Sequence, residues 1–207
     1  PMLWMAPSDW EPGRLRSAFA RDLGVLGVAP DVRAVFDVAI ARIDSALGQR
    51  VEMDFADHDL GRTRRAALLV MESELGVELA DDLADASHPL SPRLRAMLDF
   101  ARAKSAVDYA AADRVLDATV LKARRVFEDI DVLVLPTVAH GAYPLAEGER
   151  ANDADLTAFA NLAGCPAVSL PMGSLPGGLP VGLQLVGRPG AGLRLLELAA
   201  VRAATLG

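Results

Sequence analysis

A continuous apolar run, Val132 to Leu135, limits most strongly how this chain can fold. Its valines and leucines do not alternate with polar residues, as they would in a strand with one face in water. Such a run is typical of a strand inside a sheet, covered on both faces. The fold must therefore contain a sheet with packed layers on its faces, and this strand must lie inside it.

Helix and strand patterns alternate before this run. Residues 15–20 and 51–55 are predicted strands, and residues 30–47 are a predicted helix with apolar side chains at spacings of three and four. Gly48 follows that helix at the position where glycine commonly ends one. The three elements predict a strand–helix–strand crossover of about 40 residues.

The remainder of the chain is helical first and rich in strands later. Predicted helices cover residues 64–83, begin at Ser91-Pro92, and cover 105–128. Strands are then predicted at 167–171 and 180–187, with a turn at Pro176-Gly177-Gly178 that needs positive φ, and a closing helix at 193–204. The sequence therefore predicts an α/β fold, a mixed β-sheet flanked by helices.

Composition excludes several classes of protein. A net charge of −7 argues against a nucleic-acid surface, and no apolar stretch approaches the length of a membrane helix. Without a signal-peptide pattern, a cytoplasmic location is expected. The single cysteine, Cys165, rules out an intrachain disulfide framework. The start at Pro1 and a mean hydropathy of +0.25 suggest a piece of a longer chain, in which residues 1–14 form an arm or linker.

Three motifs follow one another between Asp131 and Pro189. The apolar strand ends in Pro136-Thr137, an N-x-x-G-x-P element spans 161–166, and G-L-P-V-G-L-Q-L-V-G-R-P spans 178–189. Their order and spacing resemble the C-terminal half of amidase-signature enzymes, which hydrolyse carboxylic amides. The resemblance covers most of residues 15–205 and is specific from about residue 130. It implies that residues 15–207 are the C-terminal, incomplete part of an amidase-signature domain.

The resemblance also implies where the catalytic residues lie. Catalysis in this family uses a Ser–cis-Ser–Lys triad in a Gly/Ser-rich loop of the N-terminal half, and no such loop occurs in these 207 residues. We therefore expect no catalytic residue in this chain, no activity of the chain alone, and a serine acyl-enzyme mechanism in the intact enzyme. Its partners would be a small-molecule amide and the missing N-terminal half, with no cofactor, nucleic acid or membrane.

Three other functions stay open at this stage. The chain could be a non-catalytic binding or interaction module derived from the same fold. It could be the amidase subunit of a tRNA-dependent amidotransferase, which shares the C-terminal pattern. It could also be a hydrolase that uses Cys165 as nucleophile with His140 and either Asp131 or Asp153. A buried cysteine usually acts as a small hydrophobic side chain, so packing is the favoured interpretation of Cys165.

Four residues are candidates for substrate contact. Thr137 and Val138 follow the central strand, and ligands of open α/β sheets bind beyond the carboxyl ends of strands. Asn161 and Cys165 belong to the N-x-x-G-x-P element, which the resemblance places close to the cleft. Ser169 is interpreted as a packed or backbone-bonded hydroxyl.

Other chemistry is weakly supported. Lys104 and Ser105 are neighbours that point in different directions on a helix, so they are not expected to act together. The three histidines lack metal-ligand spacing, and no metal site is predicted; they are His58, His88 and His140.

One expectation concerns the surface. If an N-terminal half normally covers this chain, a sheet edge and an apolar face should lie open, and residues 132–135 are the expected location. An open edge promotes association, so the chain is expected to form a homodimer or to aggregate.

Overall fold

The computed structural model describes residues 14–43, 47–55, 57–85, 87, 89–148 and 150–206. The predicted arm, apart from Arg14, and His88 lie outside the described residues. The chain divides into two compact units. One is formed by residues 59–119, and the other by the segments before and after them.

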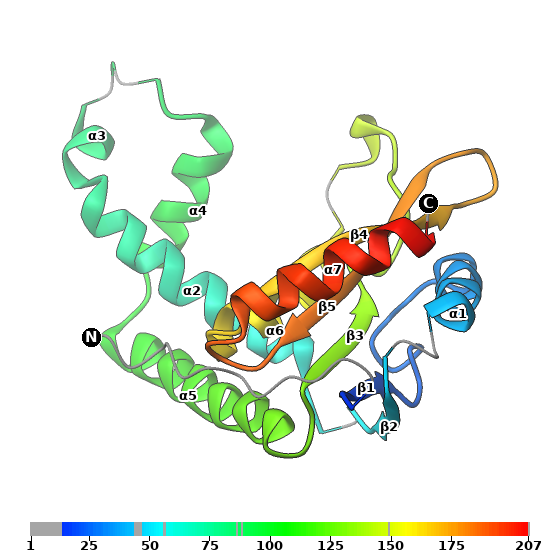
Figure 1. Ribbon diagram of the computed structural model, residues 1–207. Helices are drawn as coiled ribbons and strands as arrows, with labels where there is room; N and C mark the ends of the chain where they lie inside the picture. The colour runs from blue at the N-terminus through cyan, green and yellow to red at the C-terminus, as the bar shows by residue number, and fades with distance from the viewer. Residues whose placement is uncertain are drawn as a thin grey trace. The chain divides into compact units, whose positions relative to one another are not determined.

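The larger unit is built on a five-stranded sheet with the order β2-β1-β3-β5-β4 (Figure 1). Its strands are β1 (Arg16–Ala20), β2 (Gln49–Met53), β3 (Val132–Pro136), β4 (Ala167–Ser174) and β5 (Pro180–Gly187). Strand β1 pairs in parallel with β2 and β3, whereas β5 pairs antiparallel with β3 and β4. The predicted mixed sheet, the parallel crossover and the late hairpin are confirmed.

Strand β3 is the middle strand of this sheet, and Val132 to Leu135 are at most 2% exposed. The interior position predicted from the apolar run is confirmed. The expectation that this same run lies open is wrong, because β1 and β5 supply hydrogen bonds on both of its edges and side chains of the same unit bury its faces.

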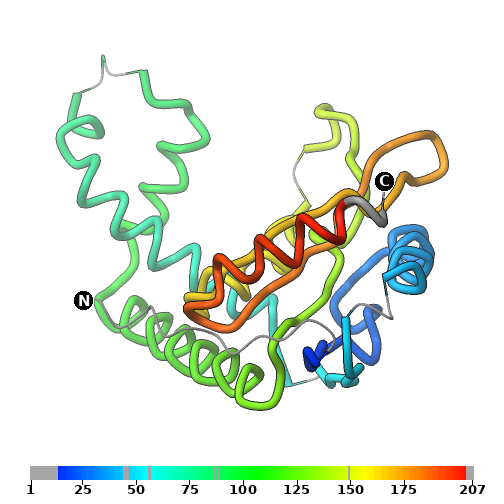
Figure 2. Tube along the Cα trace, viewed as in Figure 1, coloured from blue at the N-terminus to red at the C-terminus, as the bar shows by residue number. Residues whose placement is uncertain are grey.

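Helices lie on both sides of the strands in this unit. Helix α7 (Gly192–Leu206) packs on β4 and β5, and α1 (Pro30–Ile43) packs on β4 and on α7. Figure 1 shows α6 (Asp155–Ala163) behind β5 and α7 in front of it. The tube in Figure 2 follows the chain from β3 through the short helix η2 (Leu145–Glu147) to α6. The layers are therefore helix, sheet, helix.

Strand β2 ends at Met53, two residues before the predicted end at Phe55. Phe55 is buried, but it packs on His58 and Phe159 with ring centroids 5.1 and 6.3 Å away, and Phe127 packs on Phe159 at 6.3 Å. The alternation that suggested a longer strand therefore comes from an aromatic cluster beside the sheet.

The smaller unit is helical. It contains α2 (Leu60–Glu78), α3 (Ala80–Ala84), α4 (Pro92–Arg102) and the first part of α5 (Ala106–Asp129). Helix α2 begins before the predicted Arg64, because the carboxylate of Asp59 accepts a hydrogen bond from the backbone of Arg62 at 2.8 Å and caps it. Ser91 caps α4 as predicted.

None of the described helices combines the length and the hydropathy that crossing a membrane requires.

Candidate functional site

The loop that follows β3 is held to β5 and β4 by Thr137. Its backbone N–H donates to the carbonyl of Gly182 at 2.7 Å, and its Oγ1 lies 2.6 Å from Oγ of Ser169. The next turn of the loop is tied to the start of α1, because the carbonyl of Ala139 accepts from the N–H of Ala29 at 2.7 Å. Thr137 and Val138 are half-buried, so they lie at the border between core and surface.

The two hydroxyls stand directly over Gly182. A Cβ at this position would lie 2.6 Å from Oγ of Ser169 and 2.7 Å from Oγ1 of Thr137, closer than any side chain allows. The two hydroxyls can therefore occupy this position only because residue 182 is a glycine, which has no side chain. Ser169 is exposed and bonds Thr137, so its interpretation as a packed or backbone-bonded hydroxyl is corrected: on edge strand β4 its side of the strand is uncovered.

A hydroxyl pair of this kind has free hydrogen-bonding capacity. One hydroxyl hydrogen is used within the pair, which leaves one O–H donor and several lone pairs. An amide presents an N–H donor and a carbonyl acceptor. The pair can thus bind both polar groups of an amide.

Gln184 was not a sequence candidate, yet it connects the sheet to α6. It is 3% exposed, opposes Ser169 across β4 and β5, and its Nε2 donates to the carbonyl of Leu156 at 3.2 Å. A single polar residue inside the apolar run L-Q-L-V was the available signal. Gln184 positions α6, which carries Asn161 near its end.

The N-x-x-G-x-P element forms the exit from α6. Gly164 has φ 65° and ψ 33°, and its N–H donates to the carbonyl of Asn161 at 3.2 Å. Pro166 leads into β4, and its carbonyl accepts from Gly187 at 2.9 Å. The side chain of Asn161 is exposed at the end of the helix. The backbone at Gly164 is therefore left-handed, a conformation that glycine adopts readily.

Cys165 is half-buried, and its Sγ lies 3.9 Å from the carbonyl of Ala163. Burial raises the pKa of the Cys165 thiol to about 11, although the charge of Arg124 acts in the opposite direction. The thiol is therefore protonated at neutral pH, whereas a nucleophilic cysteine needs a lowered pKa.

A second polar cluster lies within the loop that connects the central strand β3 to α6. His140 is 8% exposed, and its Nε2 lies 2.7 Å from Oδ1 of Asp153. The hydroxyl of Tyr143 donates to Oδ2 of Asp153, and the N–H of Arg150 donates to the same oxygen at 3.2 Å. The bond from Tyr143, and then the nearby charge of His140, lower the pKa of Asp153. These contacts join the two ends of the loop. The sequence named His140 and Asp153 as possible partners of Cys165, and the structure pairs the two with each other.

The four predicted contact residues occupy two places. Thr137 and Val138 lie at the end of β3, whereas Asn161 and Cys165 lie at the end of α6. The described contacts join Thr137 to Ser169 and Gly182. Over the described ranges, no three His, Cys, Asp or Glu side chains are placed to hold a metal ion.

Two isolated candidates are explained structurally. The ammonium of Lys104 lies 4.3 Å from the ring centroid of Phe100, and the hydroxyl of Ser105 donates to Asp108 at 2.7 Å. Lys104 and Ser105 therefore do not interact as a catalytic pair.

Known proteins resemble this chain in sequence and in fold. A family model named Amidase matches residues 4–196. The chain is 31% identical over 182 residues to 2-amino-5-chloromuconic acid deaminase of Comamonas testosteroni, covering 83% of this chain and 39% of that protein. It is 41% identical over 98 residues to a glutamyl-tRNA(Gln) amidotransferase subunit of Symbiobacterium thermophilum, covering 44% of this chain and 20% of that protein.

Among solved structures, allophanate hydrolase of Kluyveromyces lactis superposes with a TM-score of 0.80 at 23% identity, covering 95% of this chain and 33% of that one. That likeness is one of fold. The chain spans less than half the length of each of these three proteins. The family match extends over nearly the whole chain, and the chain belongs to the amidase family.

Proposed function

We propose that this chain is part of an enzyme that hydrolyses carboxylic amides to an acid and ammonia or an amine. The observation that carries the proposal is the hydroxyl pair of Thr137 and Ser169 at the carboxyl end of the central strand, in a member of the amidase family. Residues 15–207 would then be the C-terminal part of one amidase-signature domain, and residues 1–14 an arm that leads into it.

The nucleophile would come from a part of the enzyme outside these residues. A serine there would attack the amide carbonyl, backbone N–H groups would hold the oxyanion, and the amine would leave an acyl-enzyme that water hydrolyses. Within this chain, Thr137 and Ser169 bond each other, and the Cys165 thiol is protonated. Neither arrangement activates a nucleophile, so we expect the chain alone to be inactive.

The role of this chain would be to bind and orient the amide. The free O–H of the pair would donate to the amide carbonyl, and its lone pairs would accept the N–H. Val138, Asn161 and Cys165 would contribute to the wall of the same site. No step of this scheme uses a cofactor or a metal ion.

Two variants of the intact enzyme test the binding role. We expect Thr137→Val and Ser169→Ala each to lower kcat/KM for a simple amide by about three- to tenfold, the effect of one neutral hydrogen bond. Ser174→Ala is the matched control, because it removes an exposed hydroxyl from the same strand. Steady-state kinetics would contradict the role if all three variants behaved alike.

The isolated chain gives a second test. Purified 207-residue chain should not hydrolyse aliphatic or aryl amides, and adding the Ser/Lys-containing part of the enzyme should produce activity. Turnover by the chain alone that disappears in Cys165→Ala would support the cysteine hydrolase instead. A reconstituted enzyme without activity would support the non-catalytic interaction module.

An amidotransferase that acts on tRNA is the second candidate. The 41% identity to a glutamyl-tRNA(Gln) amidotransferase subunit favours it. The two functions differ in the acceptor of the released ammonia. Transfer of ammonia to glutamyl-tRNA in the presence of partner subunits, without hydrolysis of simple amides, would identify the amidotransferase.

A further inference from the structure

The helical unit contains an open groove that plays no part in the proposed amide chemistry. Helix α4 packs on α2, and its side chains Leu98 and Ala101 are buried. Beside this contact lies a hollow of about 580 Å³, lined only by residues of the helical unit. A second hollow of about 560 Å³ adjoins it and shares Leu68, Glu72 and Met97 with it. Glu74 and Glu78 also line this second hollow.

The walls of the groove are apolar and accessible. Leu68 and Leu69 of α2 face Met97 and Phe100 of α4 across it. Leu68 is 41% exposed and Phe100 57% exposed, although both are large apolar side chains. Apolar surface rimmed by polar groups commonly marks a binding site, and the volume falls in the usual range for small ligands.

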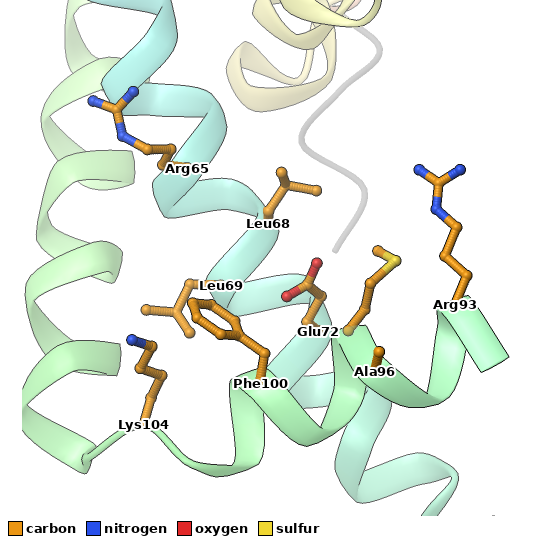
Figure 3. Close-up of a pocket in the computed structure, with 9 residues that line it drawn as sticks. Arg65, Leu68, Leu69, Glu72, Arg93, Ala96, Phe100 and Lys104 are labelled. Carbon is orange, nitrogen blue, oxygen red and sulfur yellow. The ribbon is translucent and has the colours of Figure 1, made fainter. Parts of the chain in front are cut away.

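The rim of the first hollow carries an excess of positive charge. Arg65, Arg93 and Lys104 line it with one carboxylate, Glu72, in a chain whose net charge is −7. Figure 3 shows Arg65 and Lys104 at the margin, with Phe100 between Lys104 and Glu72. Arg93 has a further interaction of its own, whereas Arg65 and Lys104 are the cations available at this margin of the hollow.

Glu72 does not neutralise these cations. No ion pair joins it to Arg65 or Lys104 within the described part of the chain. Burial raises the pKa of the Glu72 carboxyl, because partial removal from water disfavours its charged form. The charges that line the first hollow therefore favour an anion over a cation, whereas the second hollow carries carboxylates alone.

We propose that the first hollow of this groove binds a small amphiphilic carboxylate. Its alkyl or aryl body would lie on Leu68, Met97 and Phe100, and its head would pair with Arg65 and Lys104. The inference rests on the helical unit alone and does not depend on the proposed amide hydrolysis. An amphiphilic amine is the opposing case, since it would pair with Glu72.

Three probes with one tail distinguish these cases. Octanoate, octanol and octylamine would be titrated, below their aggregation thresholds, into the full 207-residue chain, and binding followed by NMR shifts or calorimetry. We expect saturable one-to-one binding in the order octanoate, octanol, octylamine. Equal affinities for octanoate and octanol, tighter binding of octylamine, or no binding of octanoate would overturn the proposal.

Variants that change the charge of the rim test the role of the cations, because a purely apolar contact would leave the affinity for octanoate unchanged in them. Arg65→Gln and Lys104→Gln should each weaken octanoate binding about two- to fivefold, the range of exposed charge pairs, and leave octanol binding unchanged. Glu72→Gln should strengthen octanoate binding, because it removes the carboxylate that lines the first hollow. Arg62→Gln is the matched control on an exposed position of α2 outside the groove, and it should change nothing. A loss in the control equal to that in Arg65→Gln would show a nonspecific charge effect and overturn the assignment.

Discussion

At the scale of the residue, backbone conformation decides what the N-x-x-G-x-P element needs. Gly164 ends α6 with φ 65°, in the left-handed region, and its N–H completes the helix by donating to preceding carbonyls. For side chains other than glycine this region costs about 1–2 kcal/mol, and asparagine is the residue that tolerates it best. Cys165, one residue later, has no such constraint on its backbone.

Gly164→Val is expected to destabilise the chain by about 2 kcal/mol or more, because a β-branched side chain adds crowding to the left-handed strain. Gly164→Asn should cost clearly less. Cys165→Ala should also be mild, since it removes one half-buried sulfur. Chemical denaturation midpoints of the three variants check this order, and equal effects would show that the conformation of Gly164 is not limiting.

The thiol of Cys165 gives a pH-dependent prediction at the same scale. With a pKa of about 11, its thiolate fraction at pH 8 is on the order of one in a thousand, against about a quarter for an ordinary thiol. Alkylation by iodoacetamide should therefore be slow at pH 8 and should still rise tenfold per pH unit between pH 8 and 10. A rate that levels off near pH 8 or 9 would contradict this. Urea-unfolded chain, which exposes the same cysteine, is the control.

At the scale of the element, the segment after β2 carries a histidine in an apolar setting. His58 packs on Phe55 and Phe159, and neither of its ring nitrogens has a hydrogen-bond partner in the described structure. Burial, and then the charge of Lys122, lower its pKa below 6.5. The folded chain thus favours the neutral ring, whereas the unfolded chain protonates it normally.

This shift makes folding stability depend on pH. The contribution of His58 is fully present above pH 6.5 and decreases as the pH falls from 6.5 toward the lowered folded pKa, because the unfolded state binds a proton first. His58→Phe should remove this slope, which is at most about 1.4 kcal/mol per pH unit for one proton. Unfolding free energies of the parent and the variant at several pH values between 5 and 7.5 test it. Parallel curves would show that His58 does not contribute.

At the scale of the whole chain, the two edges of the sheet differ in protection. Edge strand β2 carries Arg50 and Glu52, whereas the eight residues of β4 carry no charge. Ala167 and Ser169 of β4 are exposed. Uncharged strand edges tend to pair with other chains, and charged side chains prevent this. Pro171 and the register shift that follows it interrupt the second half of β4. The edge most open to association is therefore the part of β4 before Pro171, and not the apolar run of β3.

The isolated chain is expected to self-associate through β4 and to bind a hydrophobic dye. Ala167→Lys should reduce both, because it places a charge on the open strand. Ala41→Lys makes the same change at an exposed position of α1 and should leave association unchanged. Light scattering and dye fluorescence measure the outcome. A monomeric parent chain, or equal effects of the two variants, would exclude β4 as the contact.

Local patterns in the sequence determined most of the elements and the class of fold. The unbroken apolar run of β3, the helical spacing before Gly48 and the Pro-Gly-Gly turn each depend on neighbours along the chain, so they could be predicted without coordinates. Thr137 was identified because it directly follows the strand.

Contacts between distant segments were decided only by tertiary structure. Strand register brings Ser169 beside Thr137, which is 32 positions away, and places both over Gly182. No local pattern encodes the bond from Gln184 to α6 or the cluster of His140 with Asp153. The apolar composition of residues 132–135 predicted that both faces of the strand are buried. It did not predict whether the strand's edges are paired, because that depends on which strands lie beside it. Which strands pair with β3 is decided by the tertiary fold, because hydrogen bonds between strands join backbones irrespective of their separation along the chain.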